Sequence, residues 1–160
     1  MTTNLDRTDR AILAILQKNA RLTADGLADR VGASRSSVQR RIKRLTDTGV
    51  IEHEVVQVNP ERANAFMTFV VEVELERERI DLLDEFKRSM LSLDEVQQCY
   101  YITGHADFIL IVLVKDMNDY DRFSRQVFVE NPNIRRFATS VVVDRVKASL
   151  FVPLDDNETA

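Results

Sequence analysis

The sequence predicts an α+β protein of two domains, a small helical domain followed by one that combines strands with helices. Up to Gly49 the apolar residues recur at helical spacing, whereas from Phe66 onward segments of strict alternation appear between helical ones. The charge also changes sign, because residues 1–62 hold 11 Lys and Arg against 8 Asp and Glu, and the remainder holds 11 against 18. A net +3 followed by −7 favours a nucleic-acid-binding module joined to an acidic module with another role, while uneven surface charge without functional meaning would give the same split.

The composition is that of an ordinary folded protein, with 44% hydrophobic and 30% charged residues among 160. No apolar run approaches the roughly 18–20 residues that span a bilayer, and the N-terminus lacks a signal-peptide hydrophobic region. We therefore expect a cytoplasmic protein without a membrane partner. The single Cys99 cannot form an intramolecular disulfide, and His53 and His105 are far apart in sequence, so we expect no metal site and no cofactor.

Two helices are expected before residue 33. The apolar residues within 5–20 follow helical spacing, and Asp6, with Asp9 three residues later, suits the start of that helix because carboxylates complement its positive end. Thr23 is expected to cap a short second helix, which Gly32 ends.

A third helix, from Ser34 to Gly49, points most directly to a function. Its apolar stripe is Val38, Ile42 and Leu45. Its cations are Arg35, Arg40, Arg41, Lys43 and Arg44. Only two residues separate it from the second helix, which is helix-turn-helix spacing, and the second helix of that motif places its N-terminal residues nearest the base edges of the major groove. We expect DNA contacts from Thr23, Ser34, Arg35, Ser36, Ser37, Gln39, Arg40, Lys43 and Arg44.

The basic surface of this helix has chemistry suited to DNA. Arg can pair with guanine and Gln with adenine through two hydrogen bonds, while Ser, Thr and Lys mostly contact phosphates. A three-helix bundle that does not bind DNA and has a solvated basic face would show the same pattern.

The segment from Val50 to Val58 alternates in polarity and is expected to form one strand or two short ones that lead out of the first domain. Asn59 and Pro60 then indicate a turn. His53 is interpreted as a residue at the solvent edge of a strand, because no partner for a ligand or a catalytic base lies nearby.

The second half predicts elements in the order β, α, β, β, α, β. Strands are expected over 66–76, 96–103, 108–114 and 139–146, with a short one over 150–154, and helices over 80–91 and 120–127. This order is the split βαβ arrangement of ferredoxin-like folds, an antiparallel sheet with helices on one face. The other face must be covered by a partner or exposed.

Three blocks of sequence resemble a known family. They are residues 5–13 with Leu16, Gln17 and Arg21; residues 27–34 with Arg41, Leu45, Gly49, Val50 and Ile51; and residues 101–108 with Asn131, Pro132, Thr139, Val146 and Lys147. With these blocks in order, the chain resembles the Lrp/AsnC family of bacterial and archaeal transcription regulators over nearly its whole length.

The resemblance implies a winged-type helix-turn-helix domain at residues 1–50 and a β linker at 51–64. A ferredoxin-like (RAM-type) domain for effector binding and oligomerisation would occupy 65–155, before a tail at 156–160. It also implies a homodimer that pairs through its sheets and often assembles further into an octamer. Since a dimer presents two third helices, the double-stranded DNA operator should be roughly palindromic.

The resemblance further implies a small-molecule effector, typically an amino acid, bound in a cleft near a hairpin loop at the contact between dimers. Carried onto this sequence, the site falls on Gly104, His105, Ala106 and Asp107, with Tyr101, Thr103 and Thr139 nearby. Glycine exposes N–H groups that could hold a carboxylate, and Asp107 could hold an ammonium group. A plain hairpin turn in which Asp107 bonds its own backbone would use the same residues.

The chain also departs from the family pattern. Gly26 stands where Glu is common, residues 52–54 replace the usual Gly-Tyr, and residues 64–65 stand where a Gly often follows the linker proline. These differences concern the second helix and the linker.

Two other functions stay open on sequence alone. One is a small dimeric ferredoxin-like enzyme, for which the second half offers only His105 and Asp107 close together. The other is an amino-acid-binding regulatory subunit of an enzyme, in which residues 1–60 would serve for oligomerisation. We expect a regulator rather than an enzyme.

Overall fold

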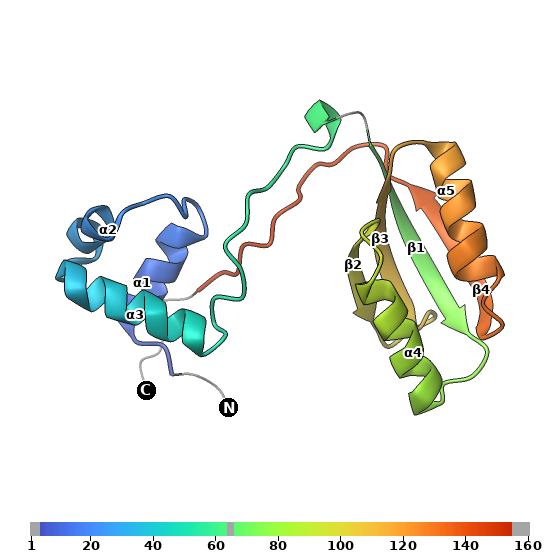
Figure 1. Cartoon of the computed structure of the whole chain (residues 1–160), viewed down its shortest axis with the longest axis horizontal. Coiled ribbons are helices and arrows are strands. Elements are labelled where there is room, and N and C mark those ends of the chain that lie inside the picture. Colours follow the sequence, from blue (N-terminus) through green and yellow to red (C-terminus); the bar gives the residue numbers. More distant parts are fainter. Residues whose placement is uncertain (1–3, 64–65, 155–160) are drawn as a thin grey trace. The chain divides into compact units, whose positions relative to one another are not determined.

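The computed structural model describes residues 4–63 and 66–154, and the chain divides into two compact units (Figure 1). Unit 1 comprises residues 1–57 together with 148–160, and unit 2 is Val58–Lys147. The sequence placed residues up to 155 in the second domain, whereas the segment after Lys147 contacts the helical unit. The side chain of Gln17 accepts from the N–H of Val152 and donates to its carbonyl, at 2.7 and 3.1 Å.

Unit 1 contains the three expected helices, which are α1 (Arg7–Leu16), α2 (Ala24–Val31) and α3 (Arg35–Asp47). Each begins after the predicted cap, because the side chains of Asp6, Thr23 and Ser34 accept hydrogen bonds from the N–H three residues later, at 2.8, 3.2 and 3.3 Å. Gly32 ends α2 in the left-handed conformation, with φ of 65°. The sequence therefore predicted this local structure correctly.

A small apolar cluster joins the three helices. Ile12 of α1, Leu27 and Ala28 of α2, and Val38 of α3 are all buried. The stripe predicted on α3 is thus confirmed as the face that packs on the other two helices. The opposite face of α3 is left for solvent.

The strand or strands predicted over 50–58 are absent, since the described residues 50–59 contain none. The physical reason is that an alternating segment needs a neighbouring strand to take its hydrogen bonds, and Val55, Val56 and Val58 are 63–75% exposed. The segment 150–154 is likewise not a strand. The linker boundary at 64–65 and the tail at 156–160 lie outside the described residues.

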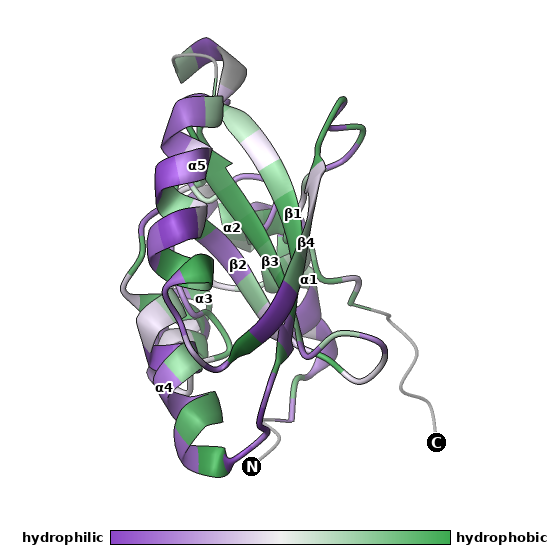
Figure 2. Ribbon diagram, turned by 90° about the vertical axis from the view of Figure 1, so that its right-hand side faces the viewer, coloured by the Kyte–Doolittle hydropathy of each residue, from purple (hydrophilic) through white to green (hydrophobic). Residues whose placement is uncertain are grey.

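Unit 2 has the predicted order of elements. They are β1 (Met67–Leu75), α4 (Ile80–Leu91), β2 (Val96–Tyr101), β3 (Phe108–Val114), α5 (Met117–Ser124) and β4 (Ile134–Val141), with a 3₁₀ turn at Glu61–Ala63 and a π-helical turn at Arg125–Val129. All neighbouring strands are antiparallel, in the order β2-β3-β1-β4. Figure 2 shows α4 and α5 on the same side of the sheet, as the ferredoxin-like prediction requires.

The last strand is displaced from its predicted position at 139–146. It starts at Ile134 because its pairing with β1 extends from Val141 opposite Phe69 to Ile134 opposite Leu75. Asn131, Pro132 and Asn133 predict the end of the preceding helix, and the strand begins directly after them. Pairing with a long central strand therefore determined the boundary more strongly than local alternation did.

The core of unit 2 lies between the sheet and its helices. Alternate residues of β1 and β3 are buried, among them Phe69, Val71, Phe108 and Leu110. The remaining side chains of both strands lie on the face without helices and are only partly covered. On β3 that face consists of the apolar residues Ile109, Ile111 and Leu113.

Replacement of Leu110 by Ala should destabilise unit 2 by about 2–5 kcal/mol, because it leaves a cavity under a fully buried side chain. Leu91→Ala, the same truncation at an 86% exposed position of α4, should change stability by less than about 0.5 kcal/mol. Urea denaturation of both variants measures the difference. Equal effects would contradict the assigned core.

Asp6→Asn should flatten the loss of stability in acid while keeping a cap. The N–H of Asp9, followed by the guanidinium of Arg41, lowers the pKa of the Asp6 carboxyl below its usual 3.8. A lowered folded-state pKa contributes stability above the unfolded-state value, and that contribution is lost as pH falls through the folded value. Between about pH 5 and about pH 2, wild type should therefore lose more free energy of unfolding than Asp6→Asn.

Denaturant titrations across that pH range provide the measurement. Asp29→Asn on α2 is the matched control, because its exposed carboxylate makes no hydrogen bond or ion pair with another described residue. If the free energy of unfolding falls equally with pH in wild type and Asp6→Asn, the pairing of Asp6 does not affect stability.

Candidate nucleic-acid interface and ligand site

The candidate DNA-contacting residues lie on α3 and on the turn before it. Ser34, Arg35, Ser36, Gln39 and Arg40 are exposed. The Ser34 hydroxyl lies 3.2 Å from that of Ser36 as well as capping the helix. Thr23, at the start of α2, is also exposed and belongs to the same helical unit.

The cations of α3 differ in how they are paired. Arg35 lies 3.2 Å from the Asp25 carboxylate, with both side chains 63% exposed, and Lys43 contacts Asp47 one turn later at 2.7 Å. Exposed pairs of this kind contribute little and exchange readily with other anions. Arg40 makes no hydrogen bond or ion pair with any other described residue, so its charge is available to an anion without loss of an existing contact.

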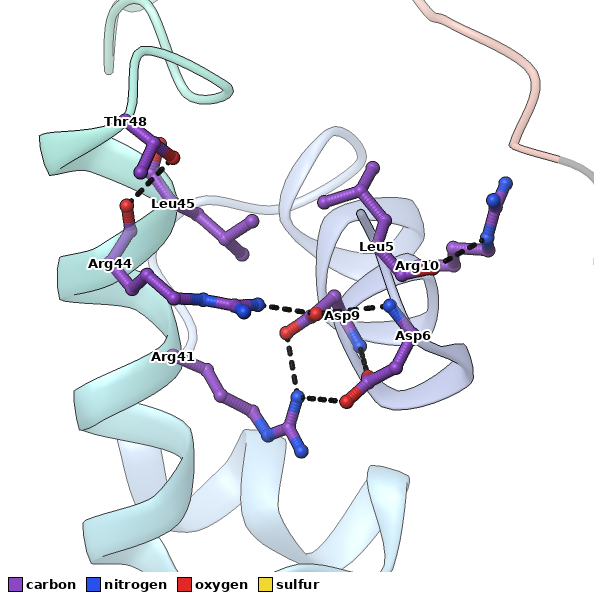
Figure 3. Close-up of polar contacts among 8 residues, drawn as sticks. All are labelled: Leu5, Asp6, Asp9, Arg10, Arg41, Arg44, Leu45 and Thr48. Atoms are coloured by element: carbon purple, nitrogen blue, oxygen red, sulfur yellow. Dashed lines mark hydrogen bonds and ion pairs between the residues drawn. The ribbon is translucent and has the colours of Figure 1, made fainter. Parts of the chain in front are cut away.

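Two further arginines of α3 point toward α1 instead. Figure 3 shows Arg41 and Arg44 converging on Asp9, whose side chain is completely buried. Arg44 had been predicted to contact DNA, and the structure gives its guanidinium an acidic partner within the protein. Among the paired cations of the predicted set, Arg44 is the one whose carboxylate partner is buried.

The candidate effector loop between β2 and β3 is tied to the end of β1. A carboxylate oxygen of Asp107 accepts from the N–H of Leu75 at 2.6 Å, and the Asp107 N–H donates to the carbonyl of Val73 at 2.9 Å. The Asp107 side chain thus bonds the backbone of a neighbouring strand, while the Asp107 carbonyl accepts from the N–H of Ile102 across the hairpin at 2.8 Å. Gly104 has φ of 149°, a conformation that side chains disfavour, and a Cβ built there would have no non-neighbouring heavy atom within 4 Å, so the backbone is open at this point of the loop.

A small cleft lies beside this loop on the face of the sheet without helices. Its volume is about 150 Å³. It is lined by Glu72, Glu74, Ala106, Arg136, Phe137 and Ala138. Glu72 also contacts the exposed His105, whose Nε2 lies 2.9 Å from its carboxylate.

The charges of the cleft are paired with one another. Arg136 donates to Glu74, and this hydrogen bond lowers the pKa of the Glu74 carboxyl and raises that of the guanidinium. Carboxylates and a guanidinium in one small cleft match the two ends of an amino acid, an ammonium and a carboxylate.

Two of the predicted effector residues do not meet. Tyr101 lies on the edge strand β2, against the ring of Phe108 and under the ammonium of Lys87, 5.0 Å from the Tyr101 ring centre. Thr139 lies on the opposite edge strand, β4, where it hydrogen bonds the hydroxyl of Tyr120. Because β3 and β1 separate these strands, the two side chains cannot line one small pocket within the chain. Thr103 lies in the exposed loop with Gly104 and His105.

Sequence reasoning missed the acidic and basic residues of the cleft and the role of Asp9. The sequence assigns Glu72 and Glu74 to the polar side of one strand and places the hairpin loop at 104–107 in a separate segment. The pairing register would have been needed to bring them together. Asp9 had been interpreted only as part of a helix start, which it also is, since its carboxylate accepts from the N–H of Asp6.

Other kinds of site find no support in the part of the chain that the structure describes. No group of three or more His, Cys, Asp and Glu side chains there is arranged to hold a metal ion. None of the helices in residues 4–63 and 66–154 combines the length and hydropathy of a membrane-spanning segment.

Comparison with protein families matches both units. Residues 5–52 match a winged helix-turn-helix DNA-binding family, and residues 68–150 match the Lrp/AsnC ligand binding domain.

Individual relatives agree with these matches. An HTH-type transcriptional regulator of Sinorhizobium fredii is 52% identical, over 94% of this chain and 89% of that protein. The leucine-responsive regulatory protein of Escherichia coli is 33% identical, over 91% and 89%. The crystal structure of a Neisseria meningitidis transcriptional regulator in complex with L-Met superimposes with a TM-score of 0.87 at 31% identity, covering 95% of this chain and 98% of that one.

These regulators are not enzymes, which removes the alternative of a ferredoxin-like catalyst. With a DNA-binding domain and a ligand-binding domain matched in the expected order, the chain belongs to the Lrp/AsnC family of transcriptional regulators.

Proposed function

We propose that the protein binds specific DNA sequences through α3 and that a small effector, an amino acid, modulates this binding or the assembly of the protein. The observation that supports the first part is the exposed N-terminal half of α3, where Arg35, Gln39 and Arg40 follow a tight turn after α2. Ser34, Ser36, Ser37, Lys43 and Thr23 would contact phosphates around them. Arg44 differs from Arg35 and Lys43 because its partner, Asp9, is buried, whereas their carboxylate partners are exposed.

The DNA-binding form is proposed to be a homodimer that can assemble further, up to the octamer expected from the family. Ile109, Ile111 and Leu113 support this, since they form an apolar row on the sheet face without helices, which a second copy would remove from water. Two copies of α3 would then enter successive major grooves, so a roughly palindromic operator is expected.

The effector is proposed to bind between the hairpin loop and the neighbouring cleft. Gly104, His105, Ala106 and Asp107 would form one side, with Thr103 at the rim, and Arg136 and Glu72 the other. Tyr101 and Thr139 lie on strands that β3 and β1 separate, so we propose that they contact the effector from different copies of the chain, at a contact between dimers. The relative solved with L-Met supports an amino acid as the ligand class. The effector must bind one assembly state more tightly than another to change DNA binding.

Arg40→Ala should weaken binding to a selected DNA duplex by about 1–3 kcal/mol, the cost of losing a contact with a base edge. Fluorescence anisotropy at fixed salt measures the affinity, with a duplex enriched from a random pool by the wild-type protein. Arg88→Ala, which removes the same charge from an exposed position on α4 of unit 2, should bind like wild type. Equal affinities for wild type and Arg40→Ala would rule out the proposed groove contact.

Asp107→Asn should abolish the response to the amino acid and retain DNA binding. Asparagine keeps an oxygen that can accept from the N–H of Leu75, so the loop is preserved, but it lacks the charge that would hold an ammonium group. A thermal-shift panel of the twenty amino acids first identifies the ligand, which at 100 times its dissociation constant stabilises by about 2.7 kcal/mol.

The same panel applied to Glu78→Gln provides the control, because that exposed carboxylate of unit 2 makes no hydrogen bond or ion pair with a described residue. It should keep the full shift. A normal shift in Asp107→Asn would place the effector elsewhere.

A further inference from the structure

Asp9 has a role beyond the start of α1. Its side chain is 0% exposed, which is unusual for a carboxylate, and each of its oxygens accepts from a different arginine of α3. One oxygen accepts from Arg41 at 2.8 Å, and the other accepts from Arg44 and from the N–H of Asp6 (Figure 3). This buried carboxylate therefore connects α1 to α3 through two ion pairs.

The cluster is balanced in charge. Arg41 also donates to Asp6 at 2.6 Å, so two carboxylates of α1 face two guanidiniums of α3. Because the charges cancel, Arg41 and Arg44 add little to the positive field that α3 presents to an anion. The cations of α3 outside the cluster are Arg35, Arg40 and Lys43.

The exposure of the two arginines differs. The Arg41 side chain is 24% exposed and is held by two carboxylates, whereas that of Arg44 is 45% exposed and is held by Asp9 alone. If the charge of Asp9 is removed, Arg44 loses the carboxylate that holds it and its side chain can turn toward solvent. Arg41 stays in place because it still pairs with Asp6.

We propose that Asp9 is a positioning residue that holds Arg41 and Arg44 away from the DNA backbone, so that α3 contacts phosphates through fewer cations than its sequence carries. This inference rests on the proposed DNA binding by α3. Its consequence is selectivity, because fewer phosphate contacts lower the affinity for DNA of any sequence while the base contacts of Arg35, Gln39 and Arg40 remain.

The affinity for DNA falls as salt concentration rises, and the slope of log affinity against log salt concentration becomes steeper by about 0.9 for every phosphate that a cation of the protein contacts. With a duplex of scrambled sequence, Asp9→Asn should bind more tightly than wild type and have a slope steeper by about 0.9 per bound protomer, because Arg44 becomes free to contact a phosphate. Asp29→Asn makes the same change of charge at an exposed position of α2, outside the cluster, and should keep the wild-type slope. The double variant Asp9→Asn/Arg44→Gln should return to it. A purely structural role for Asp9 would weaken binding to every duplex and would not steepen the slope.

A second comparison tests whether Asp9 keeps Arg44 from contacting phosphates, and it does not require Asp9→Asn to fold. Arg44→Gln and Lys43→Gln each remove one positive charge from the same helix, Arg44 from inside the cluster and Lys43 from outside it. We expect Lys43→Gln, which removes a proposed phosphate contact, to reduce the slope by about 0.9 per bound protomer and Arg44→Gln to reduce it by less than half as much. Equal reductions would overturn the role of Asp9.

Failure of the proposed DNA binding would look different. In that case the wild-type protein would show no salt-dependent binding to any duplex. Wild-type binding with a normal slope, together with equal slopes for Asp9→Asn and Asp29→Asn, would leave DNA binding in place and overturn only the positioning role.

Discussion

The buried carboxylate of Asp9 is the interaction on which the geometry of unit 1 depends. The apolar cluster of that unit is small, with Ile12, Leu27, Ala28 and Val38 as its buried members, so burial alone constrains the helices weakly. Removing one partner of a buried ion pair costs about 3–5 kcal/mol, which is a large part of the stability of a small domain. The pairing of Asp9 with two arginines of α3 therefore ties the orientation of α3, the helix proposed to contact DNA, to α1.

Unit 2 differs from unit 1 because it is built on a sheet, and helices cover only one face of that sheet (Figure 2). The same strands supply a packed core on that face and, on the other, an apolar row with a charged cleft at the end near the hairpin loop. Asp107 links the loop to β1, so a change in the loop acts directly on a central strand of the sheet. Two chain crossings join the units, and the second ends in a segment that bonds Gln17 of α1.

Much of this organisation could be predicted from the sequence. Helix caps are local, so Asp6, Thr23 and Ser34 were identified from spacing alone, and periodicity sufficed for the order of elements in unit 2. The start of β4 and the absence of a strand over 50–58 could not be predicted, because strand boundaries depend on which partner is available for pairing. The cleft was missed for the same reason, since the proximity of Glu72 to His105 follows from strand register.

The clustering of Arg41 and Arg44 around Asp9 could not be predicted for a different reason, which is that helical periodicity does not show what lies opposite a side chain. All five cations of α3 fit a helix surface in sequence, and periodicity places Arg41 beside the apolar stripe and Arg44 at the edge of the outer face without telling whether a carboxylate lies opposite them. The acidic residue is in another helix, more than thirty positions away. A charge count of α3 therefore overstates what is available to DNA.

Reciprocal linkage between effector and DNA tests most directly the claim that one unit binds DNA and the other controls when it does so. Calorimetric titration of the amino acid into the protein, alone and saturated with its operator duplex, gives two dissociation constants. If the units are coupled, these constants differ by the same factor by which the amino acid changes the affinity for DNA. Identical constants, together with a DNA affinity that the amino acid leaves unchanged, would contradict effector control.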